Sequence, residues 1–362
     1  MGYIYNFSIQ LLCILIIWLQ INKKQELYQE SYRPVGRLLY VFFILVFAYS
    51  MYTGFGGDNR RYQEFVEGGY QYYYIFDSFS FEKLYVIIAE YTQNFILWKI
   101  IVYGSAIVLS IWSIKRLGAD NLITLCFFAL IPMSSYGSTR AVLAYSILLF
   151  GYTFLYKKKI FNKILGLLIV FLSWKAHSSM ILPIVLTPLT FFKITKTRLY
   201  ILLVLFPIFV LLFNHYYGVF LGTSFMEGSM SAEKFDSYTI GEYQTQVSTV
   251  GGILRFLFGF VILPPILVGI NAVSSDTINE KFNKVIKLSF LLAYASFVIY
   301  FSELDNITFF NRYFTMIPFF LYIVMSSIIS KLSPSIRKTY LYFVLFYTML
   351  DLSYNLYCAI LI

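Results

Sequence analysis

The chain has 362 residues, of which 59% are hydrophobic and 13% are charged, and its formal net charge is +10. Soluble domains carry about 25% charged residues, so this composition excludes a soluble globular protein and indicates a polytopic membrane protein. A positive charge of this size also occurs in nucleic-acid-binding proteins, but the positions of the basic residues, described below, assign it to membrane orientation instead.

Apolar runs of the length that crosses a bilayer recur from one end of the chain to the other. Because a spanning helix needs roughly 20 mostly apolar residues, we predict an all-α polytopic fold with about twelve transmembrane helices, in a range of about 10–13. These helices form a single membrane domain over residues 1–362. The predicted spans are residues 3–21, 38–53, 95–114, 121–135, 141–156, 160–174, 178–192, 199–214, 251–270, 285–301, 307–329 and 340–361.

The orientation of the chain depends on residues 160–192, which read either as two short spans or as one kinked span. With two spans, nineteen of the 28 basic residues lie on the cytoplasmic side, whereas one merged span places fewer than half of them there. Cytoplasmic loops are enriched in lysine and arginine, so two spans are favoured. Both termini then face outward, as do the loops at 53–94 and 215–250. Within the first loop, residues 81–93 have the apolar spacing of an interfacial helix.

Several basic residues lie outside the membrane or at the outer ends of predicted spans. An arginine at an outer span end opposes the insertion bias and costs about 1–3 kcal/mol. Several such groups on one face therefore indicate an anion-binding pocket, because the planar fork of arginine suits phosphate oxygens. The alternative is that each arginine reaches lipid headgroups or pairs with an outer carboxylate such as Glu303 or Asp305. The nine outer basic residues are Arg60, Arg61, Lys83, Lys99, Arg140, Lys175, Lys234, Arg255 and Arg312.

His177 follows a short predicted span, two residues after Lys175 and on the side where Arg140 lies. An imidazole titrates near neutrality, so His177 is a candidate base for a hydroxyl nucleophile, and a neighbouring cation would hold it neutral. The alternative is a structural residue at a helix end whose imidazole bonds a carbonyl. Asp58, on a glycine-rich turn before two arginines, is the second candidate base. Its alternative role is only to order those arginines by ion pairing.

We predict neither a metal nor a cofactor. Glu303 and Asp305 form an acidic pair at an outer span end, but two carboxylates without histidine are a weak metal signal. The sequence contains no Walker loop, cysteine-rich site, GxSxG elbow or nucleotide fingerprint. This argues against ATP-driven or cytosolic nucleotide-sugar chemistry.

Short stretches of the chain resemble the Wzy-type polysaccharide polymerases of bacterial envelopes, in the EpsG-like subgroup. They are Gly56-Gly-Asp-Asn-Arg-Arg-Tyr62, Thr139-Arg-Ala-Val-Leu-Ala144, Trp174-Lys-Ala-His-Ser-Ser179 and, more weakly, Asn311-Arg-Tyr-Phe314. Together with the hydropathy profile they span most of the chain. The family often has glutamine after the arginine of the second stretch, where this chain has Ala141, so no side-chain role is expected at position 141.

The resemblance implies a metal-independent glycosyltransferase at the outer face of the bacterial cytoplasmic membrane. A sugar hydroxyl of one undecaprenyl-diphosphate-linked unit would attack the anomeric carbon of another, and undecaprenyl diphosphate would leave. The partners would be lipid-linked oligosaccharides, membrane lipids and a chain-length regulator, with no nucleic acid. The implied roles are diphosphate binding by Arg140, Arg312, Arg255 and Lys175, base catalysis by His177 or Asp58, and ordering of the outer loop by Arg60, Arg61 and Tyr62.

Two other classes remain open at this point. A flippase or transporter for lipid-linked oligosaccharides would also use arginines for diphosphate, but it needs polar residues along a path to the inner side. A membrane acyltransferase acting on glycans needs a histidine within reach of a cytoplasmic acyl donor, and His177 is predicted on the outer face. Polymerase is the favoured interpretation.

Overall fold

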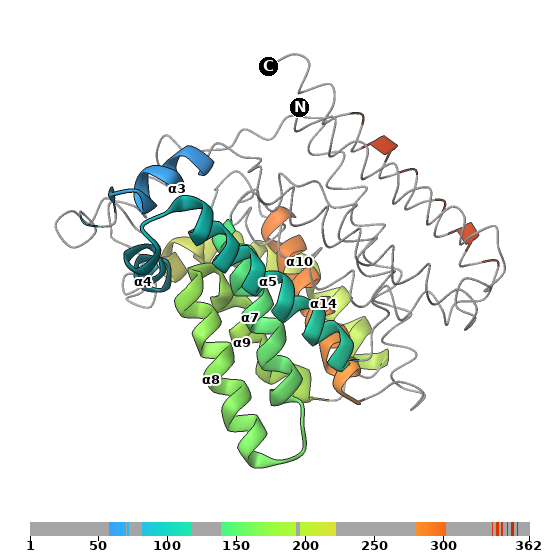
Figure 1. Cartoon of the computed structure of the whole chain (residues 1–362). Helices are drawn as coiled ribbons and strands as arrows, with labels where there is room; N and C mark the ends of the chain where they lie inside the picture. The colour runs from blue at the N-terminus through green and yellow to red at the C-terminus, as the bar shows by residue number, and fades with distance from the viewer. Residues whose placement is uncertain are drawn as a thin grey trace.

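A computed structural model of the chain describes residues 58–69, 71, 82–117, 139–192, 196–221 and 280–301, with single helical positions between 335 and 353. In this part of the chain every regular element is a helix (Figure 1). The elements are α3 (Asp58–Val66), α4 (Lys83–Thr92), α5 (Phe95–Leu117), α7 (Thr139–Leu155), α8 (Ile160–Ala176), η5 (Ser178–Met180), α9 (Ile181–Leu186), η6 (Thr187–Phe191), α10 (Lys196–Leu221) and α14 (Glu280–Phe301). The predicted all-α class is confirmed for these residues.

Six predicted spans coincide with described helical segments, and one of these, 178–192, is divided among η5, α9 and η6. By length and apolar composition, α5 is the described helix that suffices to cross a membrane, and shorter apolar stretches lie within α7, α9 to η6 and α10. The predicted spans at 3–21, 38–53, 121–135, 251–270, 307–329 and, apart from single positions, 340–361 lie outside the described residues. The number of twelve therefore stays a prediction.

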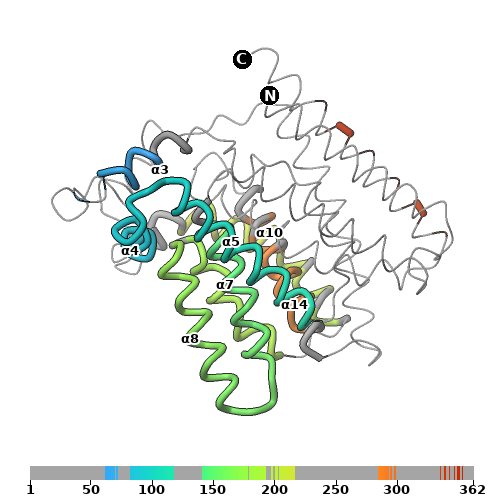
Figure 2. The backbone as a smooth tube through the Cα atoms, viewed as in Figure 1, coloured from blue at the N-terminus to red at the C-terminus, as the bar shows by residue number. Residues whose placement is uncertain are grey.

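The centre of the described structure is an antiparallel hairpin of α7 and α8. Figure 2 shows the two helices side by side, joined by the short turn that carries the three lysines at 157–159. Two glycines allow the close approach, since Gly151 on α7 lies against Val170 of α8 and Gly166 on α8 lies against Leu155 of α7. Small residues at helix contacts are typical of membrane bundles, where packing rather than hydrophobic burial drives association.

α5 packs along the other side of α7, and the two helices run parallel. The hydroxyls of Ser110 and Ser146 are 2.8 Å apart, and the rings of Trp112 and Phe150 are 4.6 Å apart. Ser110 precedes Trp112 on α5, and Ser146 precedes Phe150 on α7, so the contacts follow the same order along both helices. The first turns of α5 and α7 therefore lie at the same end of the bundle, and α7, buried on all sides between residues 141 and 149, forms its core.

The segment from η5 to η6 brings the chain back to the end of the bundle where α8 begins. The hydroxyl of Tyr152 lies 2.7 Å from that of Thr187, and the hydroxyl of Tyr156 lies 3.1 Å from that of Thr190. Tyr156 directly precedes the lysine turn, so η6 ends beside that turn. This path agrees with two passes through residues 160–192 rather than one kinked span.

Lys287 of α14 closes the end of η6. Its Nζ donates hydrogen bonds to the carbonyl of Phe192 at 3.0 Å and to that of Thr190 at 3.5 Å. We expect Lys287→Met to lower the free energy of unfolding by about 1–3 kcal/mol, because these carbonyls lose their charged donor. Thermal unfolding of the purified protein in detergent measures the change.

A matched variant is Lys284→Met, one turn earlier on the same helix. The Nζ of Lys284 lies over the rings of Phe191 and Tyr156 at 4.9 and 5.4 Å. Losing these contacts costs about 0.5–1 kcal/mol. Equal effects of the two substitutions would contradict the capping role of Lys287.

Candidate functional site

The open end of the α7–α8 hairpin brings the backbone of Arg140 near His177. Gly151 opposes Val170 and Gly166 opposes Leu155. Extending this antiparallel register places Arg140, the second residue of α7, about 6 Å, one helical turn, beyond the level of His177. The two residues that the sequence analysis placed on one side of the membrane thus lie at one end of the bundle, away from the lysine turn.

His177 joins two helical elements. Its backbone is extended, with φ −160° and ψ 128°, and its N–H closes α8 by donating to the carbonyl of Ser173 at 3.0 Å. Its own carbonyl accepts from the N–H of Met180 at 3.0 Å and so opens η5. His177 is therefore both the C-cap of α8 and the residue directly before η5, and its side chain is 1% exposed.

Ser179 bonds to the ring of His177, an interaction that the sequence analysis missed. The N–H of Ser179 donates to Nδ1 of His177 at 3.2 Å, and its Oγ lies 2.7 Å from the same nitrogen. Ser179 is also 1% exposed. The structural alternative considered for His177 was a bond to a carbonyl, whereas Nδ1 bonds to a backbone amide and a hydroxyl. The sequence Ala-His-Ser-Ser did contain a signal for this interaction, because serine residues at the start of a helix often bond to nearby polar groups.

Lys175 does not share the surroundings of His177. It lies on the exposed stripe of α8 that also contains Leu168, Phe171 and Leu172. Its Nζ is 4.7 Å from the ring centroid of Trp174 and 5.6 Å from that of Phe171. A cation over aromatic rings at a helix end is the usual arrangement at a membrane interface. The expectation that Lys175 neighbours the imidazole is therefore not met, and its binding of diphosphate stays a prediction.

The first outer-loop motif enters a helix at Asp58, whereas its two glycines, where a turn was predicted, lie outside the described residues. Asp58 is the first residue of α3, and the two arginines after it are in its first turn. Acidic residues are favoured at helix N-termini, and Tyr62, Phe65 and Val66 have the spacing of a buried helical face. All three are buried, and Tyr62 packs on Trp98 with ring centroids 5.8 Å apart. The motif thus lies on a rigid element attached to α5.

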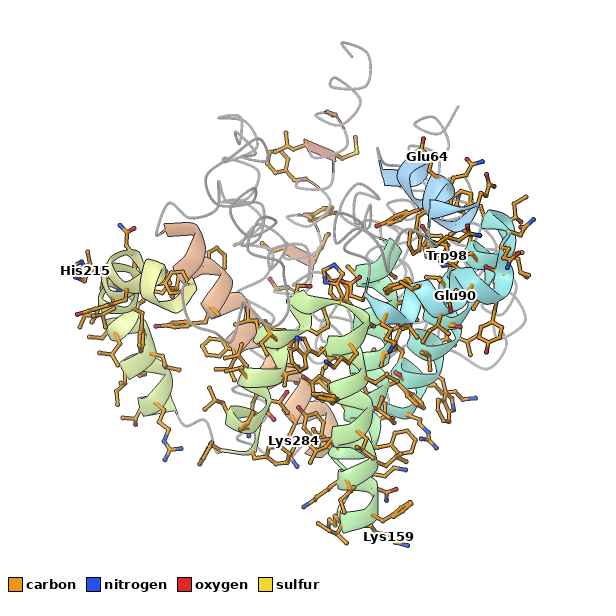
Figure 3. The ribbon with its side chains drawn as sticks, turned by 90° about the vertical axis from the view of Figure 1, so that its left-hand side faces the viewer. Glu64, Glu90, Trp98, Lys159, His215 and Lys284 are labelled. Atoms are coloured by element: carbon orange, nitrogen blue, oxygen red, sulfur yellow. The ribbon has the colours of Figure 1, made fainter. Side chains whose placement is uncertain are left out.

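The helix α4 connects this motif to the end of the hairpin. It packs on α3, α5 and α8, and Trp98 donates its indole N–H to the carbonyl of Tyr85 at 3.4 Å. Figure 3 shows Glu64 and Trp98 toward one end of the molecule and Lys159 at the other. The predicted helix at 81–93 is present, although Tyr85 and Val86 face the protein; its location in the membrane interface stays a prediction.

One further buried cation lies near α3. Lys99 on the first turns of α5 is buried, and its Nζ is 4.4 Å from the ring centroid of Phe95. A second buried amine, Lys287, lies at the opposite end. Lys99 is one of the nine outer basic residues, but the sequence predicts no binding or catalytic role for it. Its sequence position does not distinguish a buried lysine from one that reaches lipid headgroups.

The other candidate residues lie outside the described ranges. These are Arg255 and Arg312, proposed for diphosphate, and the acidic pair Glu303 and Asp305. In the described ranges, no three histidine, cysteine, aspartate or glutamate side chains are grouped so as to hold a metal ion. The structure therefore places the backbones of Arg140 and His177 at one end of the α7–α8 hairpin, while α3, which carries Asp58, Arg60, Arg61 and Tyr62, packs on α4 and α5, and α4 packs on α8.

Comparison with known proteins identifies a family. A model described as the EpsG family matches residues 37–360, which is nearly the whole chain. The matched region includes all four sequence stretches discussed above and every described helix. No curated protein and no solved structure matches the chain significantly.

Proposed function

The chain belongs to the EpsG family, which is linked to exopolysaccharide synthesis, and from this premise we propose that it is a polysaccharide polymerase. It joins undecaprenyl-diphosphate-linked repeat units at the outer face of the bacterial cytoplasmic membrane. The acceptor oxygen forms a bond to the anomeric carbon of the donor while the bond from that carbon to the diphosphate oxygen breaks. The hydroxyl proton goes to a base, and undecaprenyl diphosphate leaves with the electron pair.

The observation that carries this proposal is the common end of α3, α7 and α8. Arg60 and Arg61 are in the first turn of α3, Arg140 is the second residue of α7, and His177 is the C-cap of α8. Fixed positive charge at the leaving diphosphate stabilises the transition state, and arginines provide that charge without a metal. Arg140 and Arg312 are the proposed first ligands of the diphosphate, with Arg255 and Lys175 behind them. His177 and Asp58 are the candidate bases.

The arrangement favours a polymerase over a transporter. A transporter needs an open polar path toward the inner end. In the described part of the chain, polar groups in that direction include Tyr152, Tyr156, Thr187 and Thr190, which are buried and bonded to one another, and Lys287, whose buried amine donates to the carbonyls of Thr190 and Phe192. An acyltransferase with a cytoplasmic donor is disfavoured because His177 lies at the end opposite the lysine turn.

The test uses the purified protein in detergent. Its substrate is the lipid-diphosphate-linked repeat unit extracted from cells in which the gene is deleted, where the unpolymerised unit accumulates. We expect a ladder of longer lipid-linked glycans in EDTA and without nucleotide. A ladder that requires magnesium would redirect attention to Glu303 and Asp305. No ladder in either condition, together with movement of the same lipid across vesicle membranes, would establish the transporter instead.

A further inference from the structure

Two cations from different elements lie over one aromatic ring where α5 and α7 end. The guanidinium carbon of Arg116, on the last turn of α5, is 5.0 Å from the ring centroid of Phe154 and 4.1 Å from that of Trp112. The Nζ of Lys157, which follows α7 after one residue, is 4.9 Å from the Phe154 centroid. Phe154 in turn contacts Phe150, with ring centroids 5.1 Å apart. These five residues form a cluster of cations on aromatic rings, the inner seam, at the end of the bundle that carries the lysine turn.

The inner seam opens onto the side of the bundle. Trp112 is 40% exposed, and Val108, one turn earlier on α5, is 66% exposed. Arg116, one turn later, is exposed as well. The three residues are four positions apart, so they lie in one stripe along the helix. In a helix that crosses the membrane, this stripe presents an apolar surface to acyl chains and a guanidinium at the level of the headgroups.

The elements around the inner seam carry positive charge that they do not balance themselves. In α5, α7, α8 and the turn at 157–159 there is no aspartate or glutamate. Positive charge alone would suffice to orient the chain, but orientation does not require a guanidinium over two rings at an exposed seam. The surface is complementary to an anion with apolar chains beneath it. The basic residues at the inner ends of these elements are Lys115, Arg116, Lys157, Lys158, Lys159 and Lys163.

We propose that the inner seam binds an anionic phospholipid of the cytoplasmic leaflet. The headgroup phosphate contacts the guanidinium of Arg116, and the acyl chains lie along Trp112 and Val108. A guanidinium whose face lies over rings still presents the N–H groups of its edge, and these match two phosphate oxygens. Basic sites between spanning helices on the cytoplasmic side are typical binding places for anionic headgroups. The seam lies at the end of the bundle opposite the start of α7, so this inference does not depend on the proposed polymerase function.

The test uses the fluorescence of Trp112 and is independent of activity. The full chain in non-ionic detergent is titrated with phosphatidylglycerol or phosphatidylcholine that carry the same brominated acyl chains, which quench a tryptophan on contact. The chain has four tryptophans, so the Trp112 component is the difference between the parent protein and Trp112→Phe. We expect this component to be half-quenched at a mole fraction of phosphatidylglycerol about fivefold lower than that of phosphatidylcholine. Equal mole fractions for the two lipids would refute the proposal.

Two substitutions of Arg116 assign the headgroup preference to its guanidinium. Arg116→Gln should abolish the preference for phosphatidylglycerol, because one basic contact to an anionic headgroup accounts for about fivefold in affinity. Arg116→Lys keeps the charge but not the fork of donors, and should keep about half of the preference. Because the two lipids are compared within each variant, a general loss of structure changes both titrations and not their ratio. An unchanged ratio in Arg116→Gln would overturn the assignment.

Lys284→Met is the matched control for loss of a single positive charge. Lys284 also lies over two rings, those of Phe191 and Tyr156, at 4.9 and 5.4 Å. Tyr156 follows Phe154 by two residues and so lies on the other side of α7 from the inner seam. Its preference for phosphatidylglycerol at Trp112 should equal that of the parent, and an equal loss in Lys284→Met and Arg116→Gln would reduce the effect to net charge and refute the site.

Inorganic phosphate distinguishes a lipid site from a site for a free anion. Added at the concentration of the lipid, it should leave the quenching of Trp112 unchanged, because it lacks the acyl chains that lie along Val108 and Trp112. Relief of quenching at that concentration would show that the inner seam takes a free anion and would overturn the lipid proposal.

Discussion

A Gly166→Ala variant is expected to lose about 1–3 kcal/mol of folding stability, or more, because the α7–α8 contact has no room for a methyl group. A Cβ built on Gly166 lies 2.6 Å from Cα and 2.8 Å from Cβ of Leu155, and closer still to the Leu155 amide nitrogen. These are backbone or backbone-proximal atoms of α7, which cannot rotate away as the end of a long side chain does. The helices must separate, and thermal unfolding in detergent measures the cost.

Gly104→Ala is the matched control. A Cβ at Gly104, in the middle of α5, meets nothing within 4 Å. Alanine is favoured over glycine in a helix by about 1 kcal/mol, so this variant should be as stable as the parent or more so. Gly151→Ala should fall between the two, since its nearest contact is the Val170 side chain at 2.8 Å. A fully stable Gly166→Ala protein would contradict the close approach of α7 and α8.

The hairpin was predictable because two apolar runs flank a turn of three lysines. The polar turn and its positive charge can both be recognised from residues that are adjacent in the sequence. The predicted spans 141–156 and 160–174 differ from α7 and α8 by at most two residues at either end. The close approach of Gly166 to Leu155 was not predictable. It depends on the register between two helices, which apolar composition leaves undetermined because lipid-facing and protein-facing side chains are equally hydrophobic.

Arg140 and His177 were predicted on one side of the membrane and lie at one end of the hairpin, but the local geometry around His177 was not predicted. Lys175 and His177 are two residues apart, and that spacing led to the expectation that they are neighbours. α8 ends between them, at Ala176, so Lys175 stays on the exposed helical stripe while the extended backbone of His177 turns its ring into the core. Helix ends are the least predictable feature of a sequence, and here one end determines which side chain is buried.

The helix at α3 was missed for a related reason. The two glycines before Asp58 dominate the local pattern and predict a turn. The apolar residues Tyr62, Phe65 and Val66 indicate a helix only when Trp98 and α4 are known to cover them. The consequence for the site is favourable, since charged residues at the start of a helix anchored by buried aromatic rings are better positioned than the same residues on a loop.

Arg140→Ala is expected to lose about a hundredfold or more of polymerisation activity, which is the loss typical of removing one group that stabilises developing negative charge. Arg140→Lys should recover only part of it, because an ammonium group lacks the two-pronged geometry for phosphate oxygens. Arg116→Gln is the matched control. Arg116 ends α5 at the opposite end of the bundle, with its guanidinium 4.1 Å from the Trp112 ring centroid, and its loss should leave polymerisation within about twofold.

Stability separates this prediction from a structural role for Arg140. Inserting an arginine at the outer end of a membrane helix costs free energy. If Arg140 binds substrate and does not support folding, its replacement by alanine should leave the protein equally stable or more stable. We therefore expect Arg140→Ala to unfold at or above the temperature of the parent while its glycan ladder disappears. A fall in both would assign Arg140 to an ion pair within the bundle. An intact ladder would remove Arg140 from the diphosphate site and leave Arg312 as its first ligand.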